Sequence, residues 1–116
     1  MAEVTLIVEH EIKPGRLEDF TRMAHQLIAR TKVEPGALRY DFHVSEDGRR
    51  DVNIEVFRDA DAVLAHGRNV ADLLPAITEA APIVRLDVIG EVSDALRAEI
   101  ADAVTGYFSR LGGLSG

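Results

Sequence analysis

The chain has 116 residues, 47% hydrophobic and 28% charged, a composition typical of one globular domain. Its formal net charge of −7 disfavours nucleic acids and anionic membranes as partners, because both carry negative charge. The lack of cysteine excludes disulfides, iron–sulfur clusters and thiol catalysis. No apolar run has the length of a membrane span and no secretory signal is visible, so we expect a cytoplasmic protein.

The first part of the chain predicts a strand, a helix and a second strand. Residues 1–12 alternate apolar and polar side chains, and Lys13-Pro14-Gly15 interrupts this strand pattern. From Arg16 the apolar spacing changes to three and four residues, which indicates a helix that ends at Glu34-Pro35-Gly36. Strand alternation returns over residues 37–45.

The second part begins with a hairpin loop at residues 45–48 and a third strand around residues 52–57. An aspartate then caps a second helical region, which we expect Gly67 to kink or divide. Residues 83–91 form the fourth predicted strand, and a last helix is predicted from Ser93 to Leu111.

This order is β-α-β-β-α-β with an extra C-terminal helix, which predicts an α+β, ferredoxin-like antiparallel sheet with both crossover helices on one face. Residues 1–92 form the ferredoxin-like unit, and residues 93–116 form the C-terminal helix and tail of the same domain. The apolar stripe of the last helix has no place in the six-element fold, so we expect it to pack at a dimer or higher-order interface.

The predicted sheet has two unlike faces. We assign the more apolar set to the helices: Val4, Leu6, Val8, Leu38, Phe42, Val44, Val52, Ile54, Val56, Val84, Leu86 and Val88. The opposite face is mixed: Ile7, Glu9, Arg39, Asp41, His43, Asn53, Glu55, Phe57, Ile83, Arg85, Asp87 and Ile89. A free antiparallel sheet usually presents a clearly polar face to water, so the mixed face favours a homodimer over a monomer with scattered surface isoleucines.

Several short motifs occur along this order of elements: Lys13-Pro14-Gly15, the run from Glu34 to Tyr40, Glu55-Val56-Phe57 and Ala65-His66. In this respect the chain resembles the antibiotic biosynthesis monooxygenase family over about residues 4–89. The resemblance implies a dimeric α+β barrel in which two sheets close around paired cavities.

The same resemblance implies cofactor-independent oxygenation of quinols or polyketide anthrones, although haem-degrading enzymes and isomerases also belong to that family. The chain has Glu55-Val56-Phe57 where many relatives have Glu-x-Trp, and it contains no tryptophan. Haem degradation is therefore disfavoured.

Three residues are the candidate catalytic groups: His66, Glu55 and Arg85. His66 lies at the inward edge of the second helical region and matches the family's histidine; it is a candidate base, or a helix-end residue bonded to a terminal carbonyl. Glu55 pairs with His43 as a proton-transfer couple, or the two form a cross-strand charge pair at the dimer seam. Arg85 stabilises a substrate anion, or it neutralises Asp87 and Glu55.

The candidate substrate-binding residues are Asn53, Phe57, His43 and Tyr40. Asn53 and Phe57 are suited to contact a planar aromatic ligand, or they pack the subunit interface. Tyr40 faces the helices and is a candidate because of the family resemblance. The four histidines lack metal-ligand spacing, and neither a phosphate-binding loop nor a nucleophile motif is present. We therefore expect no metal and no cofactor.

The resemblance implies an oxygenase of a small aromatic such as a quinol, in which His66 is the proton acceptor. Two alternatives stay open: an isomerase or proton-transfer enzyme acting on a small carbonyl compound, and a non-catalytic dimeric barrel that binds a ligand.

Overall fold

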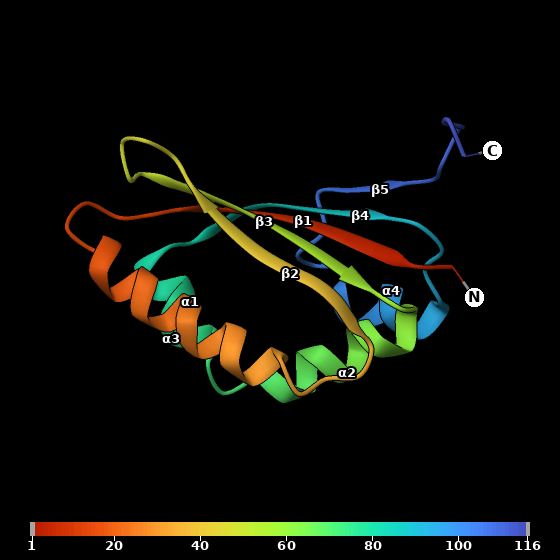
Figure 1. Ribbon diagram of the computed structural model, residues 1–116, viewed down its shortest axis with the longest axis horizontal. Helices are drawn as coiled ribbons and strands as arrows, with labels where there is room; N and C mark the ends of the chain where they lie inside the picture. Colours follow the sequence, from red (N-terminus) through yellow and green to blue (C-terminus); the bar gives the residue numbers. More distant parts are fainter. Residues whose placement is uncertain (1, 116) are drawn as a thin grey trace.

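One mixed sheet organises the chain, and all the helices lie on one of its faces (Figure 1). The computed structural model describes residues 2–115. Its elements are β1 (Val4–Glu11), α1 (Leu17–Thr31), β2 (Ala37–Val44), β3 (Arg50–Phe57), α2 (Ala60–Val70), α3 (Leu74–Ala80), β4 (Ile83–Ile89), α4 (Asp94–Ile100) and β5 (Gly106–Phe108). None of the helices among these residues has the length and apolar character needed to cross a membrane.

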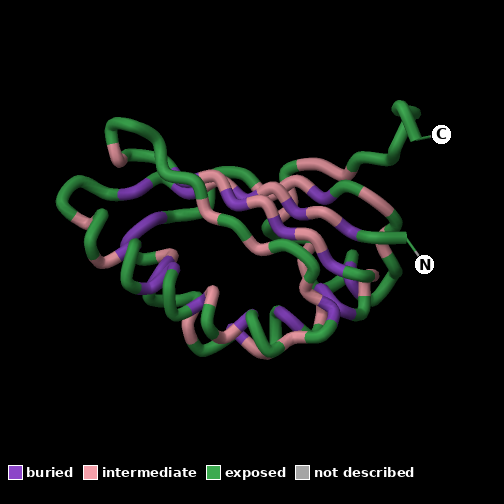
Figure 2. The backbone as a smooth tube through the Cα atoms, viewed as in Figure 1, coloured by how far each residue is buried: buried purple, intermediate pink, exposed green. Residues whose placement is uncertain are grey.

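The strands follow the order β2-β3-β1-β4-β5, in which the first four are antiparallel and β5 runs parallel to β4. The predicted ferredoxin-like α+β fold is confirmed, with strand ends within three residues of expectation; Met1, included in the first predicted strand, lies outside the described residues. The helices bury their inner faces against the sheet, as the purple segments in Figure 2 show.

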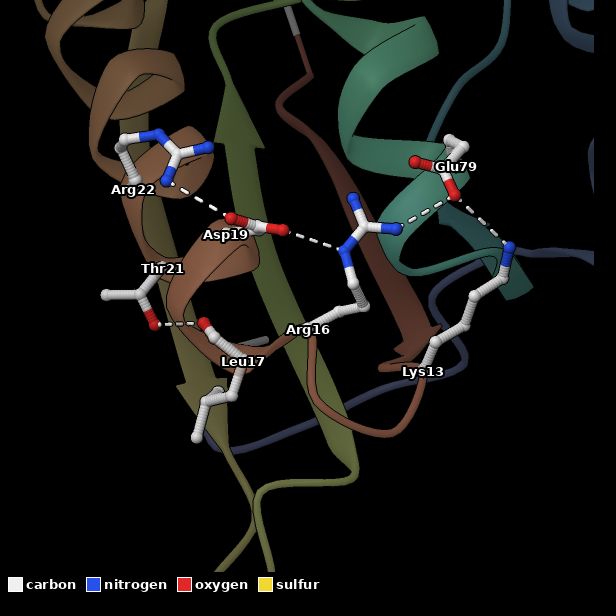
Figure 3. A network of polar contacts seen from close by, with 7 residues as sticks. All are labelled: Lys13, Arg16, Leu17, Asp19, Thr21, Arg22 and Glu79. Atoms are coloured by element: carbon white, nitrogen blue, oxygen red, sulfur yellow. Dashed lines mark hydrogen bonds and ion pairs between the residues drawn. The ribbon is translucent and has the colours of Figure 1, made fainter.

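The first helix packs as its spacing predicts, and Phe20, Ala24 and Leu27 are buried against the sheet. Polar contacts tie its beginning to α3 (Figure 3): Arg16 and Lys13 both reach Glu79. These groups are largely exposed, so their contacts orient the two helix ends and add little to the free energy of unfolding.

The second helical region divides later than predicted. The Asp59 side chain accepts a hydrogen bond from the amide of Ala62, as a cap should. The helix then continues through Gly67 without a break, and the prediction of a division there is wrong. The division lies at residues 71–73, where α2 ends and α3 begins with a proline in its first turn.

The C-terminal helix is shorter than predicted. It ends at Ile100, and residues 106–108 form a fifth strand rather than more helix. The expectation that its apolar stripe packs at a subunit interface is also wrong for its first part, because Leu96 is fully buried within the chain and Ile100 and Val104 pack on the same cluster.

The side chains of the third strand face the opposite sides of the sheet from those predicted. In the β1–β3 register Leu6 is opposite Glu55 and Val8 is opposite Asn53, and directly opposed residues share a face. The side chains of β3 that lie under the helices are therefore Asp51, Asn53, Glu55 and Phe57, and all four are buried. The valines and isoleucine predicted to face the helices lie on the open face instead.

The packing of α4 on its own chain makes a direct prediction. Leu96→Ala removes a fully buried side chain, so we expect it to lower the free energy of unfolding by about 3 kcal/mol. Urea unfolding measures this loss, which should not depend on protein concentration. Leu111→Ala, at a fully exposed position, is the matched control and should change nothing; an equal response of both variants would contradict the packing.

Candidate active site

A cavity of about 240 Å³ lies between the helices and the sheet. Most of its wall is aliphatic, drawn from both core clusters, including Leu6, Val8, Val70 and Ile77. The polar side chains that line it from buried or half-buried positions are His10, Tyr40, Asn53, Glu55 and His66. The cavity therefore combines a largely apolar wall with a small set of acid–base groups.

His66, on α2, is held by a carboxylate. Its Nδ1 lies 2.9 Å from Oε2 and 3.1 Å from Oε1 of Glu34, which precedes β2. A carboxylate only accepts hydrogen bonds, so Nδ1 carries the proton and donates a hydrogen bond to Glu34. The Asn69 amide, one turn further along α2, donates to the same carboxylate at 2.7 Å. Both contacts fix the imidazole with its Nε2 on the opposite side of the ring.

Glu55 lies beside that free nitrogen: its Oε1 is 3.9 Å from Nε2 of His66. The carboxyl group is buried, and loss of water raises its pKa to about 7, with smaller contributions from the negative charges of Asp51 and Glu34. Glu55 is thus largely uncharged below neutral pH, when it can donate a hydrogen bond as well as accept one.

Two aromatic rings frame the imidazole. Tyr40 contacts the His66 ring edge-on with 5.1 Å between centroids, and Phe57 lies 5.0 Å from it. Burial, together with the charge of Glu55, raises the pKa of Tyr40, so its hydroxyl stays protonated. Tyr40 faces the helices as predicted, and it stands directly opposite Glu55 on the neighbouring strand.

A second imidazole–carboxylate pair occupies another part of the same wall. Nδ1 of His10 lies 3.0 Å from Oδ2 of Asp51, and both side chains are buried. Asn53 stands between the two sites on β3: its amide donates to Glu55 at 3.4 Å, or, turned over, to Asp51. Among residues 2–115 no three His, Asp or Glu side chains converge as a metal site requires.

The structure separates the predicted site residues into two groups. His66, Glu55, Asn53, Tyr40 and Phe57 are brought together at the cavity or against its histidine. For Glu55, Asn53 and Phe57 the predicted face was wrong, because the register of β3 turns them toward the helices.

His43 and Arg85 do not line this cavity. The ring of His43 contacts the carbonyl of Val52 at 2.9 Å on the open face, so the predicted couple with Glu55 is wrong. Arg85 also lies on that face, 3.7 Å from Glu9 and 3.6 Å from Asp87. Its predicted contact with Asp87 is present, whereas Glu55 lies on the other side of the sheet.

Sequence reasoning missed four polar residues of these two clusters: Glu34, Asn69, His10 and Asp51. Glu34 belongs to the Pro-Gly helix stop and to one of the family motifs, and neither pattern indicates that it is the partner of His66. His10 was assigned to the first strand without a role, although a histidine within an apolar alternation is a signal of a buried pair, and Asp51 lies just before the predicted third strand. No local pattern in the sequence points to Asn69.

This geometry, a ferredoxin-like sheet with acid–base groups in an apolar cavity under its helices, defines a class of small α+β proteins. Residues 3–73 match the family model described as "Antibiotic biosynthesis monooxygenase". The chain belongs to this family. No curated protein matches it significantly.

Solved structures share the fold of this chain. MupZ from Pseudomonas fluorescens is similar over 100% of this chain and 96% of its own, with 30% identity and a TM-score of 0.88. SnoaB from Streptomyces nogalater, described as a cofactor-independent oxygenase, has 18% identity and a TM-score of 0.70 over 80% of this chain and 96% of its own. The latter likeness shows the fold alone.

The raised pKa of Glu55, about 7 against 4.5, predicts a pH dependence of stability. Between these values the folded protein holds a proton that the unfolded chain has released, so the free energy of unfolding falls as the pH rises from about 4.5 to about 7. The loss amounts to about 3 kcal/mol.

Glu55→Gln keeps the shape of the side chain without the charge, so we expect this variant to be more stable than the parent protein at pH 8 but not at pH 4.5. Urea unfolding across this range measures the difference. A constant difference at every pH would contradict the assignment.

Proposed function

We propose that the protein is a cofactor-independent monooxygenase of a small electron-rich aromatic, such as a quinol or an anthrone. The observation that carries this proposal is the His66–Glu34 pair, which aims a proton-accepting nitrogen into an apolar cavity. The family match and the description of SnoaB as a cofactor-independent oxygenase support it.

The chemistry begins with a proton transfer. The substrate O–H or acidic C–H bond breaks, its proton moves to Nε2 of His66, and Glu34 stabilises the imidazolium through Nδ1. The substrate anion then gives an electron to molecular oxygen. In the overall balance one oxygen atom enters the substrate and the other leaves as water, with the two hydrogens that the substrate loses.

The remaining side chains act on charge and orientation. Glu55 in its uncharged form supplies a hydrogen bond to the developing anion, and the ring of Tyr40 packs edge-on against the His66 imidazole. Arg85, the anion stabiliser expected from the sequence, lies across the sheet from this cavity and has no part in the scheme.

A second function, proton transfer that isomerises a small carbonyl compound, is favoured by one observation. An acid and a base stand 3.9 Å apart at Glu55 and His66, an arrangement in which one group removes a proton while the other returns it. This reaction needs no oxygen.

His66→Ala tests the proposed base. With anthrone and 1,4-dihydroxynaphthalene as substrates, we expect oxygen uptake by the variant to fall about 100-fold or more, because general-base catalysis is worth that much. His25→Ala, an exposed helix position outside the cavity, is the control and should retain full activity. Unchanged oxygen uptake by His66→Ala would exclude His66 as the catalytic base. Product formed in the absence of oxygen would instead indicate the isomerase.

We further propose that two chains pair through the open face of the sheet. This face carries Ile7, Val52, Ile54, Val56 and Ile89, each exposed or only half-buried within one chain. Ile7 and Ile54 stand directly opposite one another at its centre. Charged groups, among them Glu9 and Arg85, surround this patch and leave it apolar only in the middle.

Ile54→Glu tests the pairing. A carboxylate at the centre of the patch should convert a dimer into a monomer, since a buried unpaired charge costs several kcal/mol. Light scattering coupled to gel filtration measures the mass. Val33→Glu, a change of the same kind at a position 79% exposed after α1, should leave the dimer intact; a parent protein that runs as a monomer would refute the pairing.

A further inference from the structure

The His10–Asp51 pair has no role in the chemistry proposed above, although it lines the same cavity. We infer that it is a second ligand-binding site in that cavity, which recognises a hydroxyl group at the end of the substrate remote from His66. The substrate is then a rigid aromatic compound with oxygen substituents at two opposite ends. This inference rests on the proposed function, because it assumes that the cavity holds an aromatic substrate.

The two pairs are built in the same way. In each, the Nδ1 of a buried histidine donates to a carboxylate, and a second group from the chain fixes that carboxylate. Asp51 accepts the backbone amide of His43 at 3.2 Å on one oxygen and His10 at 3.0 Å on the other, as Glu34 accepts Asn69 and His66. A carboxylate held from two sides fixes the imidazole in one tautomer.

The neighbours of His10 leave only its Nε2 available to a ligand. Phe20 contacts the ring edge-on at 5.5 Å between centroids and Asp51 takes Nδ1, while His10 itself lines the cavity. Its Nε2 makes no hydrogen bond to any of residues 2–115 that are described. With the proton on Nδ1, that nitrogen is an acceptor suited to a hydroxyl group.

The spacing sets the length of the ligand. Asp51 and Glu55 are four residues apart on β3, a separation of about 13 Å along the strand. His10 stands opposite Asp51 in the register, and His66 lies beside Glu55. After a hydrogen bond of about 3 Å at each end, the remaining length fits a rigid bicyclic ring. Asn53 lies between the two pairs on β3, and most of the cavity wall is aliphatic.

A purely structural role for the pair is the competing explanation, and binding measurements separate the two. The probes are 2,6-dihydroxynaphthalene, with hydroxyls at both ends, and 2-naphthol, with one. Their fluorescence is read without background from tryptophan, which the chain lacks. We expect the parent protein to bind the dihydroxy compound about tenfold more tightly, the effect of one net hydrogen bond.

His10→Asn is the informative variant, because the asparagine amide keeps a donor for Asp51 in place of Nδ1 but removes Nε2. It should lose the preference for 2,6-dihydroxynaphthalene and keep the parent's affinity for 2-naphthol. His25→Asn, at an exposed position on α1, should behave as the parent protein. If His10→Asn does not fold, the ¹⁵N resonance of the His10 ring in the parent protein gives the same answer, since only the dihydroxy probe should shift it.

The outcomes are distinct. Equal binding of both probes by the parent protein, or a preference that survives in His10→Asn, overturns the second site and leaves the proposed function standing. Failure of the parent protein to bind either probe overturns the aromatic-binding cavity itself, and the inference with it.

Discussion

The pairing of β3 with β1 is the constraint on which the rest of the structure depends. Because Leu6 stands opposite Glu55 and His10 opposite Asp51, an antiparallel register sends two carboxyl groups and the amide of Asn53 under the helices. Groups of this kind are costly to bury without partners. His10 supplies a partner for Asp51 and Asn53 donates to Glu55, while Nε2 of His66 lies 3.9 Å from the Glu55 carboxyl group. The polar row of this one strand therefore lies beside both imidazoles.

Most of the fold follows from the spacing of apolar residues, because two-residue and 3.6-residue periods distinguish strands from helices wherever one face is buried. The face of β3 does not follow in this way. Its valines and isoleucine alternate with Asp51, Asn53 and Glu55, and hydrophobicity alone assigns the apolar set to the helices. That rule fails when a sheet also has an apolar open face, since the register with a neighbouring strand then decides which set is covered.

The candidate site was predictable in part for the same reason. His66 was predicted from its place on a helical stripe and from the family resemblance, whereas Tyr40 was a candidate through the resemblance alone, because its strand alternation predicts only that it faces the helices. Glu34 and His10 lie far from their partners in the sequence, and only the folded chain brings them together. The last helix was predicted to be too long because Val104 and Phe108 continue the helical spacing of Leu96 and Ile100. The sequence there also includes Thr105-Gly106, where the chain turns into an added strand.

The C-terminal segment has a consequence for the chemistry of the cavity. It lies beyond residues 3–73, which match the family model, yet Leu96 and Ile100 line the same cavity as Glu55 and His66. The aliphatic wall that α4 adds helps to exclude water from the carboxyl group, and loss of water is the main cause of the raised pKa of Glu55. The protonation state of the acid thus depends on an element outside the matched region. The ferredoxin-like unit positions the acid–base groups, and α4 contributes aliphatic side chains to the cavity that surrounds them.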